Sequence, residues 1–396
     1  MRSFLKTSLP LLLAVLALDA CSSGPDLSQG RAAPSGPIAS GPMSLQPVSF
    51  DALPGWRDDG MAEALPALRK SCDKITTLPS HKTLSESFAG TAGDWLGPCG
   101  ALRQVPAENT AAARAWAEHW LQPYRVTAGG NSEGVFTGYC EAELRGSRHQ
   151  GGAYQTPLYG RPQGWPADPA KVGQKLATRA EIEAGALAGK AQVLLWVDDP
   201  VDAHILHIQG SGRVLMDDGS SAQVGYDGNN GQDWVGLGKI LIRHGLLGPG
   251  ESNMPSVRAW LKSHPAQATA LMDENPRYVF FRMLNNGEGP IGAEGVALTT
   301  GRSLAVDTHY IPLGSPLWLD TTDPSGKPLR RLMVAQDTGK AITGPVRGDF
   351  FWGPGEAAFN NAGRMNSRGG YYILLPRQRS APVALGGQSM IIAEAE

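Results

Sequence analysis

Glycine and proline interrupt this chain so often that they limit the length of its helices and strands. The 396 residues include 50 Gly and 30 Pro. The apolar runs between them are short, as at Val193–Val197 and Tyr278–Phe281, and such runs bounded by turn residues predict β-strands. Helical patterns are confined to segments such as Met61–Ser71, Thr110–Leu121 and Pro255–Met272. We therefore expect a mainly β protein with short helices.

The first twenty residues have the pattern of a secretory signal peptide. Arg2 and Lys6 supply positive charge before the apolar run Ser8–Leu18, which is too short to span a bilayer permanently. We therefore expect residues 1–20 to be removed and to take no part in the fold.

The next residues predict a lipid anchor. Cys21 directly follows the signal pattern and its surroundings resemble a bacterial lipobox, although Asp19 is unusual there. Ser22, in place of Asp, favours the outer membrane over the inner one. Residues 22–49 are rich in Ser, Gly and Pro, so we expect residues 21–49 to be a lipidated cysteine and a flexible tether. The predicted location is the periplasmic face of a Gram-negative outer membrane; a chance cysteine after an ordinary signal peptide is the alternative.

Three cysteines remain beyond Cys21, and an exported protein folds in an oxidising compartment. One disulfide and one free thiol is the natural count. We expect Cys72 to pair with Cys99, because both lie in the loop-rich N-terminal part, and Cys140 to be buried. Sequence alone leaves the other pairings open.

Several functional classes find no support in the sequence. The net charge is −2 and there is no basic stripe, which argues against a nucleic-acid partner. No phosphate-binding loop or dinucleotide motif is present, so we expect no cofactor. His204 and His207 flank an apolar pair, and Ile205–Gln209 has the pattern of a strand, on which residues three apart point to opposite faces. We therefore expect no metal.

Three aspartates in the C-terminal third of the chain lie where a β-rich domain could bring them together. Asp307 and Asp337 end apolar runs, and Asp349 is followed by the aromatic run 350–352. Burial against aromatic rings raises the pKa of a carboxyl group, as a general acid requires near neutral pH. If the three strands converge, these acids form a candidate catalytic site; for each one, the alternative is a role in capping a turn.

The triplet Asp337-Thr338-Gly339 also occurs in aspartic proteases. Those enzymes bring together two such triplets, whose carboxylates share a proton. This chain has one triplet and is too long for a half-size subunit that dimerises. A protease is therefore the less favoured interpretation.

Another set of segments has the composition of a sugar-binding cleft. Aromatic, amide, hydroxyl and glycine residues gather at 136–141, 209–213 and 226–231. Pyranose rings present both hydroxyl groups and apolar C–H faces, which such residues can contact. Ordinary turn chemistry is the alternative.

Taken in order, these motifs resemble the membrane-bound lytic transglycosylase A (MltA) family over about residues 50–376. The motifs are Phe-Thr-Gly-Tyr at 136–139, Gly-Ser-Arg at 146–148, Pro-Leu-Tyr-Gly-Arg-Pro at 157–162, Gln-Gly-Ser-Gly-Arg at 209–213, Tyr-Val-Phe-Phe-Arg at 278–282, Gly-Arg-Ser-Leu-Ala-Val-Asp at 301–307, Gln-Asp-Thr-Gly at 336–339 and Arg-Gly-Asp-Phe-Phe-Trp-Gly at 347–353. The chain departs from the family pattern at Cys140, Ala142, His204 and Lys340.

The resemblance implies two domains with a glycan groove between them. A double-psi β-barrel would be formed by residues 50–141 together with 286–396, and it would include a three-aspartate (3D) domain at about 296–376. A smaller β-rich domain, residues 142–285, would be inserted into it.

The resemblance also implies an activity. It predicts a peptidoglycan lytic exotransglycosylase, a lyase that cleaves the β-1,4 bond between N-acetylmuramic acid and N-acetylglucosamine without water and leaves 1,6-anhydro ends, in cell-wall turnover. The family's catalytic acid falls on Asp349, with Asp337 as the second acid and Asp307 in support. The sugar-binding positions correspond to Thr137, Gly138, Tyr139, Gln209, Gly210, Ser211 and Gly339.

The implied partners are peptidoglycan glycan strands, the membrane through the lipid anchor, and cell-wall synthesis or divisome proteins. A competing function from another class is a non-catalytic peptidoglycan-binding lipoprotein that uses the same groove. Products released from sacculi distinguish the two.

Overall fold

The computed structural model describes residues 41–85, 88–167, 169–284 and 289–377. The predicted signal peptide, Cys21 and most of the predicted tether lie outside these residues, as does the predicted domain boundary at Asn285. No helix in the described ranges is both long enough and apolar enough to cross a membrane.

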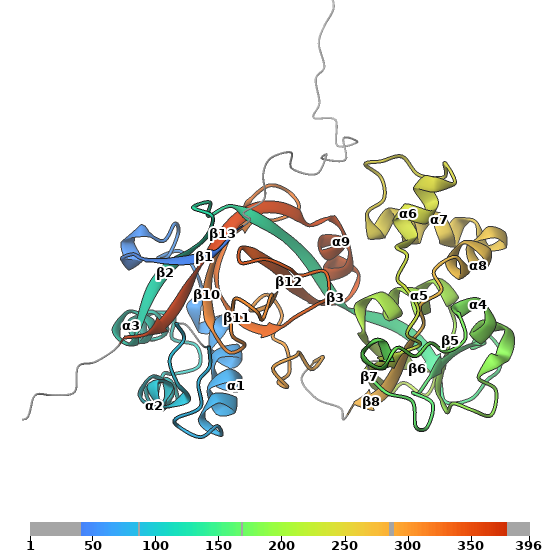
Figure 1. The fold of residues 1–396 in the computed structure, drawn as a ribbon, viewed down its shortest axis with the longest axis horizontal. Helices are drawn as coiled ribbons and strands as arrows, with labels where there is room; N and C mark the ends of the chain where they lie inside the picture. The colour runs from blue at the N-terminus through green and yellow to red at the C-terminus, as the bar shows by residue number, and fades with distance from the viewer. Residues whose placement is uncertain (1–40, 86–87, 168, 285–288, 378–396) are drawn as a thin grey trace, which may run out of the picture.

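A closed barrel of six strands forms one half of the molecule (Figure 1). Its strands are β3 (Gly134–Ser147), β9 (Ser303–Val306), β10 (Pro316–Thr322), β11 (Pro328–Asp337), β12 (Arg347–Pro354) and β13 (Asn366–Pro376). They pair in the order β13-β10-β11-β9-β12-β3, and pairing of β13 with β3 closes the ring. Two of the pairs are parallel, β11 with β9 and β12 with β3. This ring confirms the expected barrel.

Successive side chains of each barrel strand point alternately into the barrel and away from it. One buried cluster, which includes Phe136, Leu304 and Met333, fills the interior. A second buried cluster lies outside the barrel, where Trp318 and Leu332 pack against three helices. These helices are α1 (Leu65–Thr76), α2 (Leu96–Leu102) and α3 (Thr110–Trp120).

The Cys72–Cys99 disulfide links α1 to α2, and Cys140 is free and buried. Both cysteine predictions are confirmed. The predicted tether is partly wrong, because Met43–Pro47 forms strand β1, which pairs with β2 (Leu121–Ala128). Backbone pairing with an edge strand orders a segment whose composition alone predicts a flexible chain.

A second sheet forms the other half, at the right of Figure 1. It contains β4 (Thr156–Tyr159), β5 (Val193–Val197), β6 (Ser211–Met216), β7 (Ser221–Asn229) and β8 (Val279–Leu284), and it is joined by the last part of β3. Residues Ala142–Gly146 of β3 pair with β6, whereas Val135–Tyr139 pair with β12. One continuous strand therefore belongs to both sheets, and we call the part of the molecule built on the second sheet the insert.

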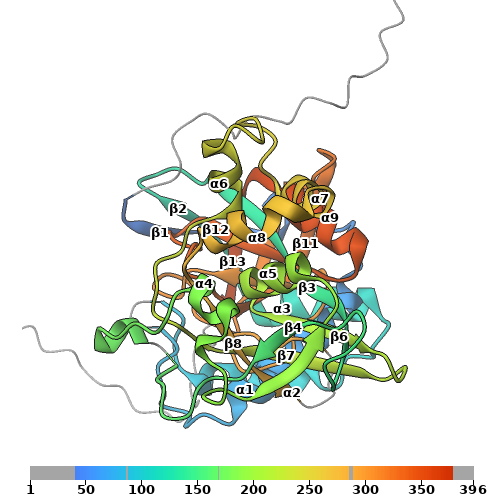
Figure 2. The same cartoon turned by 90° about the vertical axis from the view of Figure 1, so that its right-hand side faces the viewer.

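Helices cover one side of the insert (Figure 2). They are α4 (Arg179–Glu181), α5 (Pro200–Gln209), α6 (Leu237–Arg243), α7 (Met254–Ser263) and α8 (Pro265–Asp273). A last helix, α9 (Glu356–Arg364), follows β12 of the barrel and packs against α7.

The predicted strand Ile205–Gln209 is wrong, because these residues end helix α5. The Asp199 side chain accepts hydrogen bonds from the amides of Val201 and Asp202, Pro200 occupies the first turn, and Gly210 ends the helix with a φ of 80°. These end signals outweigh a β-branched apolar run. His204 and His207 are consequently on one side of a helix, where both are buried.

Candidate active site

A cleft with a volume of about 400 Å³ lies between the barrel and the insert. The insert contributes Gln209, Gly210, Ser211, Gly225, Tyr226, Arg282 and Leu284, and β3 contributes Tyr139. The barrel side contributes Pro290, Ile291, Gly292, Ala293, Leu298, Ala305, Asp337, Thr338, Gly339, Ile342 and Asp349. Segments that are far apart in sequence thus meet around one space that contains two carboxylates.

Asp349 lies in the middle of β12, between β3 and β9. In the sheet, Asp349 lies opposite Thr137 of the parallel strand β3 and opposite Ala305 of the antiparallel strand β9. The Thr137 hydroxyl donates to Asp349 Oδ1 at 2.5 Å and accepts from Arg347 Nη2 at 2.7 Å. Asp349 is thereby held through one of its oxygens, while its carboxyl group still lines the cleft.

Asp337 ends β11 on the other side of β9. A bulge in the ladder places it opposite the same residue, Ala305. Its Oδ1 accepts the backbone amides of Ala293 and Thr338, both at 2.9 Å. Since β9 separates the two aspartates, their backbones are about 10 Å apart across the sheet, and the small Ala305 side chain lies between them.

Burial raises the pKa of both carboxyl groups. For Asp349, burial is the main cause and the charge of Asp337 adds to it, whereas the Thr137 hydrogen bond and the Arg347 charge oppose it. For Asp337, burial again dominates over the amides of Thr338 and Ala293 and the nearby Tyr139 hydroxyl. Like charges in one site disfavour double ionisation, so the pair tends to keep one proton.

Tyr139 is the third polar group beside the acids. Its pKa is raised well above the usual value by burial and then by the charges of Asp337 and Asp349. Its hydroxyl is buried beside the Asp337 carboxylate, and this contact also raises its pKa. Tyr139 therefore remains neutral, and its hydroxyl is a donor next to Asp337.

Asp307 does not line the cleft. Its carboxylate accepts the amides of Gly344 and His309 and contacts His309 Nδ1 at 2.8 Å. Although burial raises its pKa, these hydrogen bonds outweigh burial and the net pKa is lowered. The structure therefore separates Asp307 from the other two aspartates and places it where it joins two loops of the barrel.

Most of the other predicted site residues do line the cleft, namely Tyr139, Gln209, Gly210, Ser211 and Gly339. Gln209 also anchors the insert to β3, because its Oε1 accepts the amide of Cys140 at 3.3 Å. Thr137 and Gly138 lie behind the cleft lining. Thr137 contacts Asp349, and Gly138 leaves no room for a Cβ against Trp352 and Ala362.

Tyr226, in the predicted sugar-binding segment 226–231, is 44 % exposed and presents an aromatic side chain in the cleft. Other residues of the cleft were not predicted. Ala293 contributes only a backbone amide, which composition and spacing do not reveal. Arg282 ends the Tyr-Val-Phe-Phe-Arg motif. The alternation of side chains between the two faces of that strand could have predicted that Arg282 lies outside the core. Within the described ranges, no group of three or more His, Cys, Asp or Glu is arranged to hold a metal ion.

Comparison with known families and proteins agrees with this architecture. The family of the MltA specific insert domain matches residues 135–282, and that of the 3D domain matches residues 302–375. The membrane-bound lytic murein transglycosylase A of Escherichia coli K12 is 34% identical over 248 residues, which are 60% of this chain and 65% of that protein. The match therefore spans slightly less than two thirds of that relative.

Solved structures extend the similarity over nearly the whole of their chains. A structure of E. coli MltA with bound chitohexaose is 27% identical, covers 89% of this chain and 99% of that one, and has a TM-score of 0.65. The lytic transglycosylase LtgG of Burkholderia pseudomallei is 40% identical, with coverage of 86% of this chain and 99% of that chain and a TM-score of 0.64. With this identity over a complete relative, and with both family domains in order, the protein belongs to the membrane-bound lytic murein transglycosylase A (MltA) family.

Proposed function

We propose that the protein is a lytic transglycosylase of peptidoglycan. It cleaves the β-1,4 bond between N-acetylmuramic acid and N-acetylglucosamine and forms a 1,6-anhydro-N-acetylmuramic acid end. The observation that carries this proposal is the position of Asp349, a carboxyl group with a raised pKa that lines a cleft next to a second acid. The relative with bound chitohexaose supports a β-1,4-linked amino sugar as the ligand of such a cleft.

In the first step, protonated Asp349 acts as a general acid. It donates its proton to the glycosidic oxygen as the bond to muramic acid C1 breaks, and the sugar acquires oxocarbenium character. Thr137 binds Oδ1 of Asp349, so the proton is carried by the other oxygen. The raised pKa keeps a larger fraction of the acid protonated near neutral pH than an exposed aspartate would retain.

In the second step, ionised Asp349 acts as a base. It removes the proton of the C6 hydroxyl, whose oxygen attacks C1 and closes the anhydro ring. The proton from the first step stays on the departing sugar, the proton of the C6 hydroxyl restores the protonated form of Asp349, and water is neither added nor released. One acid that changes its role is therefore sufficient, whereas hydrolysis uses a second carboxylate to activate water or to form a covalent intermediate.

Asp337 supports this cycle by its charge. Two backbone amides oppose the effect of burial on the pKa of Asp337, and when Asp337 is ionised its charge raises the pKa of Asp349 and faces the developing positive charge on the sugar. Tyr139 supplies a neutral hydroxyl donor to the same space. Gln209, Gly210, Ser211 and Gly339 bind glycan along the cleft, and Asp307 supports the loops around it.

The test is digestion of purified sacculi followed by mass spectrometry of the soluble products. Wild-type protein should release muropeptides with the anhydro mass, and Asp349→Asn should release none while it still binds sacculi. Asp320→Asn is the matched control, because Asp320 is a barrel aspartate that pairs with Arg330 away from the cleft. Products that carry an added water would indicate hydrolysis, and an unchanged sacculus would indicate a binding protein.

The location, partners and domain limits form a second proposal. We propose that Cys21 is acylated and holds the protein to the periplasmic face of the outer membrane, with cell-wall synthesis or divisome proteins as neighbours. We also propose the insert limits 142–285 and the barrel segments 50–141 and 286–396. Cys21→Ser should move the protein from the membrane fraction to the soluble periplasmic fraction; retention in the membrane would contradict the anchor.

A further inference from the structure

A second cavity, of about 360 Å³, lies where the insert helices meet the barrel. Strand β3 contributes to both spaces, Tyr139 to the active cleft and Cys140–Arg145 to this second cavity. The remaining lining comes from α5 and the two residues before it, from Leu215 of β6, from α7 and from the start of α9. The cavity thus marks a joint between the two halves of the molecule.

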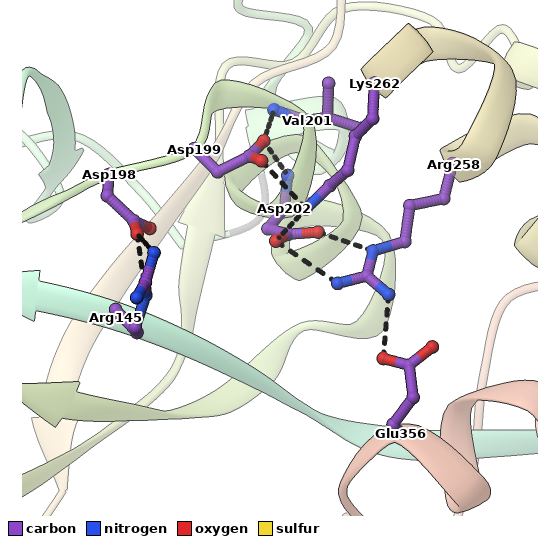
Figure 3. A network of polar contacts seen from close by, with 8 residues as sticks. All are labelled: Arg145, Asp198, Asp199, Val201, Asp202, Arg258, Lys262 and Glu356. Carbon is purple, nitrogen blue, oxygen red and sulfur yellow. Dashed lines mark hydrogen bonds and ion pairs between the residues drawn. The ribbon is translucent and has the colours of Figure 1, made fainter. Parts of the chain in front are cut away.

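A network of ion pairs crosses this joint (Figure 3). Arg258 of α7 donates to both oxygens of Asp202 on α5, through Nε at 2.7 Å and Nη2 at 3.3 Å. Its remaining Nη1 donates to Glu356 Oε2 on α9 at 2.8 Å. One guanidinium therefore connects two insert helices with a barrel helix, which a single-point charge such as an ammonium cannot do with the same geometry.

Packing between α7 and α9 supports the contact between Arg258 and Glu356. The Arg258 guanidinium lies 5.0 Å from the centre of the Phe359 ring on α9. Further along the two helices, the Pro255 ring approaches Gly363 so closely that a Cβ at Gly363 would not fit. Cys140, Ile205 and Phe359 share one buried cluster that spans the joint.

The elements joined by Arg258 lead directly to the two walls of the cleft. Helix α9 begins at Glu356, two residues after strand β12, which carries Asp349. Helix α5 carries Asp202 in its first turn and ends at Gln209, which lines the insert wall. The ion pair between Arg258 and Glu356 is therefore placed to set how the acid and the sugar-binding wall face each other.

We propose that Arg258 is a positioning residue for the reaction, because its pairing with Glu356 holds the insert wall at the distance from Asp349 that a bound glycan requires. The inference rests on the proposed transglycosylase function for its activity readout. Arg258 does not line the cleft, so it acts through α9 and α5 and touches no substrate.

The network offers a way to separate positioning from folding. Lys262 also pairs with Asp202 at 2.6 Å and with Asp199 at 2.8 Å, so the insert keeps a cation at this place when Arg258 is neutralised. The Glu356 side chain is 67% exposed, and an exposed partner contributes little to overall stability. Arg145 and Asp198, which pair at 2.8 Å in the same cavity, both lie on the insert side and do not bridge the joint.

The experiment compares Arg258→Gln and Glu356→Gln with the control Arg145→Gln. On soluble uncrosslinked glycan strands, each of the first two variants should raise KM about five-fold and change kcat by less than about two-fold, because a looser joint reduces the fraction of molecules with a binding-competent cleft. The double variant should match the single ones, and Arg258→Lys should recover part of the loss. Arg145→Gln should keep the wild-type constants.

A second measurement follows the joint itself. Spin labels at Ser220→Cys on the insert and Lys327→Cys on the barrel, both exposed positions, give the distribution of distances across the molecule. That distribution should broaden in Arg258→Gln and Glu356→Gln, with thermal unfolding of Glu356→Gln close to that of wild type.

Three results would overturn the proposal. One is an unchanged distance distribution in both variants, whatever happens to KM. Another is an effect of Arg145→Gln as large as that of Glu356→Gln. The last is a loss confined to Arg258→Gln that parallels a fall in its melting temperature. If wild-type protein released no anhydro products, the proposed function would fail, and the distance distributions would still decide whether the joint depends on Arg258.

Discussion

The two walls of the active cleft are built from different chemistry. The barrel wall carries carboxyl groups on strands whose neighbours are buried, and each of its two acids is held by hydrogen bonds from named donors. The insert wall offers an amide, a hydroxyl, backbone at Gly210 and Gly225, and the exposed ring of Tyr226. This difference supports the proposed function, in which the barrel performs the bond cleavage and the insert binds and aligns the glycan.

The largest expected effect is on the barrel wall. Asp349→Asn should reduce turnover by at least about 10³-fold, because it removes both the acid and the base. The same change should stabilise the fold. The folded-state pKa of Asp349 is raised, so its ionised form is disfavoured, and stability falls as pH rises through that pKa.

Thermal unfolding at two pH values tests this trade-off. Asp349→Asn should melt at a higher temperature than wild type at pH 8, with a smaller difference at pH 4, where a larger fraction of wild-type Asp349 is protonated. A variant that melts lower at pH 8 would show that the charge of Asp349 stabilises the barrel and would contradict the assigned direction of its pKa.

An effect of intermediate size is expected from removal of the disulfide, which lies outside both walls of the cleft. Replacing Cys72 and Cys99 together by Ser removes a cross-link between residues 27 apart in sequence and should lower the free energy of unfolding by about 3 kcal/mol. Neither wall contains this disulfide, so kcat and KM at low temperature should stay near the wild-type values. Loss of activity in a variant that remains folded would mean that α1 or α2 also shapes the cleft.

A smaller effect is expected on the insert wall. Gln209→Ala removes the amide that we propose binds the sugar and also the anchor to the Cys140 amide, so KM should rise about ten-fold with a smaller change in kcat. Glycan-binding measurements with a catalytically inactive Asp349→Asn background give the binding change directly. If kcat fell as strongly as in Asp349→Asn, the division of labour between the two walls would be wrong.

The smallest effect concerns the pH profile. Burial raises the pKa of Glu294 to about 7, against hydrogen bonds from Ser71 and Gln336 and the charge of Lys74. Its neighbour Ala293 donates to Asp337, so ionisation of Glu294 should loosen this contact. With its pKa raised above the unfolded value, Glu294 stabilises the fold at low pH, and this stabilisation weakens as pH rises through 7.

Glu294→Gln removes this titration. Between pH 7 and pH 8 the wild-type activity should fall about two-fold more steeply than that of the variant. Parallel measurements on Glu251→Gln, an exposed glutamate of the insert, provide the control. Identical profiles for wild type and Glu294→Gln would show that Asp337 keeps its position when Glu294 ionises.

The sequence predicts the barrel wall better than the insert wall. Asp337 and Asp349 end or interrupt apolar strands beside glycine and aromatic residues, so their placement follows from local patterns that survive in the fold. The sequence predicts a strand where helix α5 ends, because Ile205–Gln209 is short and apolar and periodicity does not distinguish a strand from a buried helix in so short a run. Its capping residues Asp199 and Gly210 carried the decisive signal.

Contacts between distant segments could not be read from the sequence. The pairing of Asp349 with Thr137 joins residues 212 apart, and the amide of Ala293 reaches Asp337 only because its loop folds over β11. The exclusion of Asp307 from the cleft has the same origin. Asp307 follows β9, Asp337 ends β11 and Asp349 lies within β12, and the register of these strands determines which of the aspartates lie opposite Ala305.

The sharing of β3 between both sheets has a consequence for how the chain reaches its folded state. Its barrel half stays an unpaired edge until β12 is available, more than 200 residues later, whereas its insert half can pair with β6 much earlier. Contacts between residues so far apart in sequence form slowly, because closing a long loop costs entropy before the strand pairing can stabilise it. We therefore expect the insert to fold first and the exposed half of β3 to be the segment most prone to mispairing during folding.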